Sequence, residues 1–171
     1  MKLIVDFAQP GSTPWSIVND DVMGGRSTSK MEVSEHGSAR FEGFVSLENN
    51  GGFASTRAAF QSLNLSGYAG VILKVRGDGR RYQLRFRTDD AFDGVAYRAT
   101  FDTASGEWLE LKLRFADFEA SFRGSVLSDV GPLDPARIRQ MGFLIADKKE
   151  GPFRLEIAWV KAADAEALAN R

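Results

Sequence analysis

The sequence lacks cysteine altogether and has a single histidine, His36. Without cysteine, the chain can form no disulfide, no thiolate nucleophile and no cysteine-ligated zinc or iron–sulfur centre. One histidine cannot build a multi-histidine metal site, and a Ser-His-Asp triad would have to use His36, which we expect in a turn of the polar stretch SEHGSAR. We therefore expect no metal, no cofactor and no hydrolase-type catalytic centre.

The lack of cysteine and the single histidine still allow one catalytic class, an enzyme that uses two carboxylates. Glycosidases need paired aspartates or glutamates at a specific separation, which a sequence does not give. The aspartates that could serve all lie in expected turns: Asp20, Asp21, Asp89, Asp90 and Asp93. Because aspartates in turns commonly cap their own backbone, we expect a protein without catalytic residues.

Long apolar runs and a charge imbalance are also missing. No stretch approaches the ~20 consecutive apolar residues of a membrane-spanning helix, and Asp6 interrupts the N-terminal apolar run that a secretory signal would need. The 22 basic and 23 acidic residues give a net charge of −1, which argues against nucleic acid as a partner. With 171 residues, 43% of them hydrophobic, the chain can bury one substantial core. We expect one cytoplasmic domain over residues 1–171, with no membrane insertion.

What the sequence does have is apolar alternation with a period of two, which predicts half-buried strands. It recurs at 71–75, 82–86, 97–101, 109–113 and 153–159. Glycine-rich or aspartate-rich breaks separate these segments, as in antiparallel sandwiches. Helical signals are confined to one turn in DPARIRQ, from Asp134, and a short helix in the tail ADAEALANR. The sequence therefore predicts an all-β fold.

If the apolar sets point inward, the residues between them form a face rich in arginine: Arg76, Arg85, Arg87 and Arg98. A solvated face balanced by acids is the commoner arrangement. A face that binds an anion or a protein is the alternative, because guanidinium groups match carboxylate and phosphate geometry. The segment from 76 to 98 holds six arginines against four aspartates and no glutamate, which favours the second interpretation.

Three glycine-containing stretches predict shaped turns. WSIVNDDVMGGRSTS combines Asn19-Asp20-Asp21 with Gly24-Gly25, and we expect positive φ at these glycines. NNGGF, with Gly51 and Gly52, predicts a wide turn before a strand. RGDGRRY has Gly77 and Gly79 but lacks the third glycine and the helix of a dinucleotide loop, so Asp78-Gly79 predicts a hairpin turn.

Six stretches, in order and almost end to end, resemble the complex I intermediate-associated protein 30 family, which is associated with assembly of respiratory complex I. They are WSIVNDDVMGGRSTS, FEGFVSLENNGGFASTR, VILKVRGDGRRYQLRFRT, YRATFDT, WLELKLRFADFEASFRG and MGFLIADKKEGPFRLEIAWV. The resemblance implies a jelly-roll β-sandwich similar to galactose-binding domains and no established catalytic activity. Because the start of the chain lacks the arginines and amphipathic pattern of a mitochondrial presequence, we expect a stand-alone, bacterial-type member.

Two functions follow as hypotheses. The first is a non-catalytic binding or scaffolding protein, an assembly factor that holds a protein partner such as a respiratory-complex subunit. The alternative is a module that binds carbohydrate, a small anion or another polar ligand, with Trp15, Tyr68, Tyr97 and Trp108 as stacking platforms. The candidate binding residues are Asn19, Asp20, Arg57, Arg76, Asp78, Arg85, Arg87, Tyr97, Arg98 and Trp108.

Overall fold

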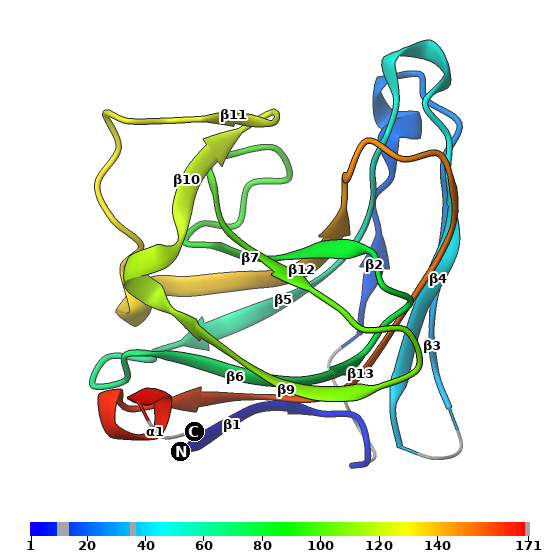
Figure 1. Ribbon diagram of the computed structural model, residues 1–171. Helices are drawn as coiled ribbons and strands as arrows, with labels where there is room; N and C mark the ends of the chain where they lie inside the picture. The colour runs from blue at the N-terminus through cyan, green and yellow to red at the C-terminus, as the bar shows by residue number, and fades with distance from the viewer. Residues whose placement is uncertain (10–13, 35–36, 170–171) are drawn as a thin grey trace.

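Two antiparallel β-sheets face each other, as the alternating pattern predicts (Figure 1). The computed structural model describes residues 1–9, 14–34 and 37–169. The six-stranded sheet has the order β3-β4-β13-β6-β9, and β1 also pairs with β13. Its strands are β1 (Lys2–Asp6), β3 (Thr28–Val33), β4 (Ala39–Val45), β6 (Gly70–Arg76), β9 (Trp108–Arg114) and β13 (Gly151–Ala163).

The seven-stranded sheet has the order β11-β10-β8-β7-β12-β5-β2. Its strands are β2 (Ser16–Ile17), β5 (Ala54–Leu63), β7 (Arg81–Arg87), β8 (Ala96–Asp102), β10 (Glu119–Phe122), β11 (Ser125–Val126) and β12 (Ile138–Ile145). Short helical turns connect the strands: η1 (Asp20–Met23), η2 (Glu48–Asn50), η3 (Phe115–Asp117) and η4 (Pro135–Arg137). The predicted terminal helix is α1 (Ala165–Ala169), and the predicted turn after Asp134 is η4; both are confirmed. Within the described residues, no helix has the length and apolarity needed to cross a lipid bilayer.

The core lies between the two sheets, where the apolar halves of the alternating strands meet. Tyr82, Leu84 and Phe86 of β7 have no exposed surface. The ring of Phe153 on β13 lies 6.4 Å from that of Tyr82 and 5.0 Å from that of Phe41, centroid to centroid. The contact between Phe153 and Tyr82 joins the two sheets. Both contacts bury large apolar side chains, the main source of folding free energy. The polar residues that alternate with them are left on the outer faces.

The predicted hairpin at Asp78-Gly79 is wrong. Gly79 does have φ 88°, but β6 pairs with β13 and β9, whereas β7 pairs with β8 and β12. The turn therefore carries the chain from one sheet to the other. Gly77 does not have a positive φ within the described backbone, and a Cβ there would overlap the side chain of Thr103. Local residues give the turn its positive φ at Gly79, but packing between the sheets decides which strands pair.

The outer face of β7, β12 and β5 lies between two raised borders (Figure 1). The 88–95 loop with β10 and β11 forms one border. The turns η1 and η2 and the loop from β12 to β13 form the other. This arrangement turns the outer face of the seven-stranded sheet into the floor of a groove.

Candidate functional site

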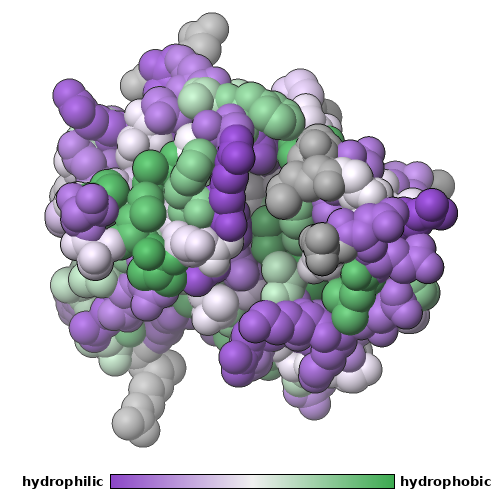
Figure 2. Space-filling model, turned by 90° about the horizontal axis from the view of Figure 1, so that it is seen from above, coloured by the Kyte–Doolittle hydropathy of each residue, from purple (hydrophilic) through white to green (hydrophobic). Residues whose placement is uncertain are grey.

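A groove of about 770 Å³ runs over the outer face of the seven-stranded sheet. Its floor consists of residues from β5, β7, β8 and β12. Phe92 and Arg123 line one border, and Leu47 and Lys148 line the other. Figure 2 looks down on this face and shows hydrophilic and hydrophobic side chains next to one another. The groove thus offers a ligand both charge and apolar surface.

Three arginines and a glycine lie in one row across the floor. Arg98 of β8 is the register partner of Arg85 of β7. Arg85 also pairs with Gly142 of β12, which in turn pairs with Arg57 of β5. Directly paired residues point to the same side of a sheet, so the three guanidinium groups share the groove face. Gly142 has no side chain, so none stands between Arg85 and Arg57 in this row. Arg87 lies two residues along β7 from Arg85, on the same face.

Within the part of the chain that the structure describes, none of these four arginines forms an ion pair at 4.0 Å or less. Arg57 Nη1 donates to the backbone oxygen of Phe92 at 2.7 Å, and its guanidinium lies 5.2 Å from the centre of that ring. Arg87 Nη1 donates to a backbone carbonyl at 2.7 Å. Arg85 Nε donates to Gln83 Oε1 at 3.0 Å. Neutral groups therefore hold Arg57, Arg85 and Arg87 in place without cancelling their charge.

Burial and mutual repulsion act on the same guanidinium groups. The pKa of Arg85 falls to about 10, first because of burial and then because of the positive charges of the other three arginines. The pKa of Arg57 also falls to about 10, through burial and repulsion by Arg87, although Asp93 opposes the shift. Burial likewise lowers the pKa of Arg87, although the charges of Asp93 and Asp89 oppose the shift. All remain protonated at neutral pH, so the free groove holds destabilising positive charge that an anion would relieve.

One border of the groove is fixed by the buried carboxylate of Asp20, which has no exposed surface. Its Oδ1 accepts from Ser27 N at 2.8 Å, and its Oδ2 accepts from Ser27 Oγ and Gly52 N, each at 2.6 Å, and from Phe53 N at 3.3 Å. Burial raises the pKa of Asp20, but these hydrogen bonds outweigh it, so the pKa lies below the ordinary 3.8. The carboxylate joins the loop after β2 to the loop before β5.

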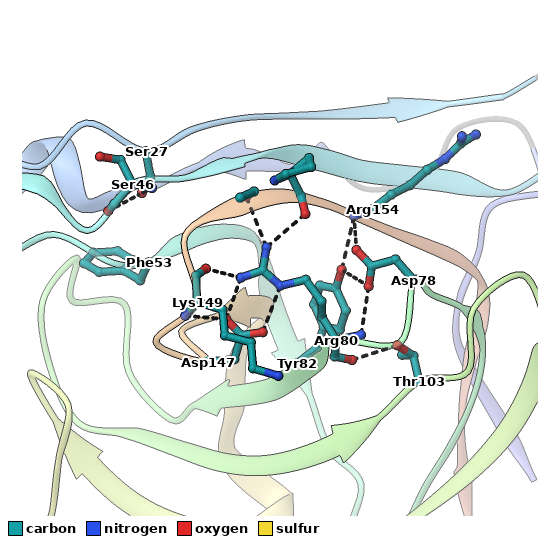
Figure 3. A network of polar contacts seen from close by, with 12 residues as sticks. Ser27, Ser46, Phe53, Asp78, Arg80, Tyr82, Thr103, Asp147, Lys149 and Arg154 are labelled. Carbon is teal, nitrogen blue, oxygen red and sulfur yellow. Dashed lines mark hydrogen bonds and ion pairs between the residues drawn. The ribbon is translucent and has the colours of Figure 1, made fainter.

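A second network on the same border centres on Arg80 (Figure 3). Its Nε and Nη2 donate to the two carboxylate oxygens of Asp147 at 2.9 and 2.6 Å. Its Nη1 donates to the backbone oxygens of Gly151 and Pro152 at 3.1 and 2.9 Å, and Nη2 also donates to the backbone oxygen of Lys149. One guanidinium therefore holds the whole turn from β12 to β13.

A second hollow, of about 630 Å³, lies on the outer face of the six-stranded sheet. Its charged side chains pair with one another: Lys30 Nζ and Arg154 Nε lie 3.6 and 3.9 Å from the carboxylate oxygens of Glu42. Because the arginines of the groove have no such partners among the described residues, we take the groove as the candidate site.

The family model described as Complex I intermediate-associated protein 30 matches residues 5–157. The chain belongs to the complex I intermediate-associated protein 30 family. The family protein of Drosophila melanogaster, labelled mitochondrial, is 29% identical over 181 residues, which cover 92% of this chain and 61% of the relative. That of Mus musculus is 32% identical over 166 residues, which cover 85% of this chain and 51% of the relative. This chain thus spans about half to three-fifths of these relatives.

Solved structures support the jelly-roll β-sandwich expected for a member of the complex I intermediate-associated protein 30 family. A family 11 carbohydrate-binding module from Clostridium thermocellum, in complex with a mixed-linked tetrasaccharide, has a TM-score of 0.70 and 16% identity, covering 96% of this chain and 95% of that one. A family 29 carbohydrate-binding module has a TM-score of 0.55 and 10% identity, covering 97% and 90%. At these identities the similarity concerns the fold.

In this member of the complex I intermediate-associated protein 30 family, the motif glycines make room for Asp20. Gly24 and Gly52 have φ of 89° and 127°, which favours glycine. Gly25 does not share this conformation within the described backbone, so the prediction of positive φ is wrong there. A Cβ at Gly25 would lie 2.6 Å from Asp20 Oδ1, and one at Gly51 would lie 2.5 Å from Oδ2. The glycines are therefore needed partly for conformation and partly for space.

Replacing Gly24 or Gly25 by valine is expected to lower the free energy of unfolding by about 1–3 kcal/mol, for different reasons. At Gly24 the cost is backbone strain, because a Cβ would meet no described atom within 4 Å. Gly24→Asn should therefore recover most of the loss. At Gly25 the cost is overlap with Asp20, so Gly25→Ala should already be destabilising. Thermal melting checks both, and unchanged midpoints would show that neither glycine is required.

The predicted arginine face is divided between the two sheets. Arg57, Arg85, Arg87 and Arg98 meet in the groove. The prediction that Arg76 shares their face is wrong, because β6 belongs to the six-stranded sheet.

Arg76 and Trp108 instead contact each other on the opposite side of the sandwich. Arg76 Nη2 pairs with Glu156 Oε2 at 2.8 Å, and its guanidinium lies 4.9 Å from the Trp108 ring. Trp108 is partly exposed, at 37%, but it cannot contribute to the groove. Its sheet and the groove face are separated by the core.

The other predicted aromatic platforms face inward. Tyr97 is 7% exposed and donates from its hydroxyl to the backbone oxygen of Gly131 at 3.2 Å. Trp15 packs against Phe7 and Phe143, with ring centroids 5.8 Å apart in each pair. Half-buried Tyr68 packs on the same core. None of these three rings lines the groove. His36, which we expect in a turn, lies outside the described residues.

Two polar candidates are engaged within the fold. Asn19 Oδ1 accepts from Ser29 Oγ at 2.7 Å and from Ser55 N at 3.3 Å. Asp78 accepts from the Tyr82 hydroxyl at 2.9 Å and, through Oδ2, from Arg154 N at 2.8 Å. Both side chains connect segments distant in the sequence, and neither lines the groove.

Sequence reasoning missed several residues of the site. Gly142 carries a recognisable signal, because an isolated glycine within an apolar strand often marks close approach of another group. No such signal in the sequence marks Arg80, Asp147 or Arg123, because a charged residue at a turn usually lies in solvent. Gln140 alternates with apolar residues on β12, but its role depends on Nε2 donating to two backbone oxygens of the 88–95 loop, each at 3.0 Å.

Proposed function

We propose that this protein is a non-catalytic binding domain that holds a segment of a protein partner in its groove during assembly of a multi-subunit complex. The observation that carries the proposal is the groove floor, where four arginines have no carboxylate partner within 4.0 Å among the described residues. The names of the curated relatives, which refer to an intermediate of complex I, support a protein partner. A subunit of a respiratory complex is the partner class that fits those names.

A cluster of arginines that have no ion-pair partner among the described residues is costly for the free domain. Each buried charge without a counter-ion destabilises the folded state, and neighbouring like charges add to that cost. A partner that supplies the missing negative charge recovers this free energy on binding. The apolar borders add surface that a polypeptide side chain can cover.

Photo-crosslinking from the groove tests the proposal. With p-benzoylphenylalanine at Phe92, on the groove border, we expect a specific protein from the native host to become attached. The same group at Lys112, on the exposed outer face of the six-stranded sheet, should not capture it. Ala146→Trp, which fills one end of the groove, should reduce the yield at Phe92. Equal labelling from both positions, or no specific product, would refute the proposal.

Carbohydrate or another small polar ligand is the alternative occupant. The structural neighbours are carbohydrate-binding modules, and the amide side chains of Gln83 and Gln140 line the groove. A glycan array combined with thermal shifts in sugars and nucleotides tests this alternative. A hit that Ala146→Trp removes would favour it, and an array without hits would eliminate it.

A further inference from the structure

Arg85 and Arg98 leave much of their hydrogen-bonding capacity unused. Each guanidinium carries its N–H donors in a fork that matches a carboxylate. Arg85 uses Nε on Gln83, and Arg98 makes no hydrogen bond or ion pair with any described residue. Because the two residues are direct partners on β7 and β8, their Cα atoms lie about 5 Å apart. Two guanidinium groups with free N–H donors therefore extend from neighbouring positions on the groove floor.

The carboxylates around this pair do not neutralise it. Glu119 on β10 is the register partner of Arg98, yet it is exposed and forms no ion pair within 4.0 Å among the described residues. Asp93, from the 88–95 loop, pairs with Arg123 at 2.8 Å, and its charge acts on the other two groove arginines. The half of the groove floor around Arg85 and Arg98 therefore keeps an excess of positive charge.

Apolar side chains stand on both borders of the same groove. Phe92 on one border is 61% exposed, and Leu47 on the other is 44% exposed. Arg57 covers one face of the Phe92 ring, which leaves less of that ring for stacking a sugar. Positive charge on the floor and apolar groups on the borders complement a polypeptide that places an acidic residue between apolar ones.

We propose that Arg85 and Arg98 form a clamp for one carboxylate, the side chain of an aspartate or glutamate in a partner segment that crosses the groove. The inference rests on the proposed function, since it gives the chemistry of the segment that the groove holds. Each fork donates to the carboxylate, and the flanking apolar side chains of the segment contact Phe92 and Leu47. The clamp selects an acidic residue because a neutral one leaves both charges unpaired.

Two short peptides test the clamp directly. The full chain is titrated with N-acetyl-Phe-Glu-Phe-amide and, as the matched neutral probe, N-acetyl-Phe-Gln-Phe-amide, each up to about 20 mM, where millimolar affinities are measurable. Binding is followed through the NMR signals of the arginine Nε–H groups. We expect the glutamate peptide to shift the Arg85 and Arg98 signals and to bind about tenfold more tightly than the glutamine peptide.

Matched variants assign the effect to the clamp. Arg85→Gln and Arg98→Gln should each remove most of the preference for the glutamate peptide while keeping the melting midpoint equal or higher, because each removes a repelling charge. Arg81→Gln is the control: Arg81 is on the same strand but exposed and paired with Asp102 at 2.7 Å, and its variant should bind as the parent does. Equal affinity for the two peptides, or no shift of the two arginine signals at the highest concentration, would overturn the clamp.

The outcomes separate the clamp from the function on which it rests. If Phe92 still crosslinks a protein partner and Ala146→Trp blocks it, but Arg85→Gln has no effect on either partner or peptide, the groove binds protein and the clamp is wrong. If hexagalacturonate shifts the two arginine signals and the glutamate peptide does not, the occupant is an acidic polysaccharide, and both the peptide clamp and the proposed function are refuted.

Discussion

Replacing Asp20 by alanine is expected to lower the free energy of unfolding by about 3–4 kcal/mol, which corresponds to a fall of roughly 10 °C in the melting midpoint. The carboxylate accepts hydrogen bonds from Ser27, Gly52 and Phe53 in a site with no exposed surface. Without it, these donors lose their partner in a cavity. Losing a buried polar network is among the mechanisms that give large effects.

The neighbouring Asp21 provides the matched control. Its side chain is exposed, so Asp21→Ala should leave the midpoint almost unchanged. Thermal or urea unfolding of both variants measures the difference. If Asp20→Ala and Asp21→Ala melt alike, Asp20 does not hold the two loops together.

The Asp20→Asn variant removes the negative charge of the side chain and keeps its size and shape. One end of the amide is a donor, so it would face the N–H and O–H groups that the carboxylate accepts, and we expect most of the destabilisation to remain. Because the folded pKa lies below 3.8, the contribution of Asp20 is present above that pH and is lost as pH falls through the folded value. The stability difference between parent and Asp20→Asn should therefore shrink in acid. A constant difference from pH 7 down to about pH 2 would contradict this account.

The strands could be predicted because burial of one face imposes a period of two on the sequence. The same period places Arg85 and Arg87 on the outer face of β7. The groove itself depends on the order of the strands in the sheet, which the alternation of apolar residues does not predict. Register brings Arg57 into the row through Gly142, whereas Arg76 is carried to the other sheet.

Asp20 shows a different limit of sequence reasoning. An aspartate in a turn is usually solvated, and nothing local distinguishes it from Asp21. Its burial follows from Gly52 and Phe53, which reach it from the loop before β5. Of the glycines that predict shaped turns, Gly25 and Gly51 leave space for this carboxylate, whereas Gly24 and Gly52 adopt a positive φ. The family resemblance points to the Asn-Asp-Asp and glycine motifs, and the structure explains them by the hydrogen bonds and the space that the Asp20 carboxylate needs.

The two polar networks brace the same border of the groove, and Figure 3 shows the one around Arg80. The Asp20 network fixes the loop that carries Leu47 and Gly52, and the Arg80 network fixes the loop that carries Lys148. Leu47 N also donates to Glu150 Oε1 at 3.2 Å, which ties one loop to the other. A rigid border reduces the entropy lost when a partner binds.

Replacing Arg80 by alanine is expected to destabilise the protein by about 3–5 kcal/mol, because it leaves the largely buried carboxylate of Asp147 without its ion-pair partner. Three backbone oxygens of the turn from β12 to β13 lose their donor at the same time. Arg80→Lys should recover only part of the loss, since an ammonium cannot reproduce the planar fork. Burial raises the pKa of Asp147, but hydrogen bonding and the charge of Arg80 outweigh it and hold that pKa below 3.8.

Arg81 is the control on the adjacent position. Its pair with Asp102 is exposed on both sides, so Arg81→Ala should scarcely change the unfolding midpoint. The double variant Arg80→Ala with Asp147→Ala should be at least as stable as Arg80→Ala alone, because it removes the orphaned charge. Urea unfolding of these variants gives the coupling free energy. Similar losses for Arg80→Ala and Arg81→Ala, or strictly additive losses in the double variant, would show that the guanidinium does not hold this border of the groove.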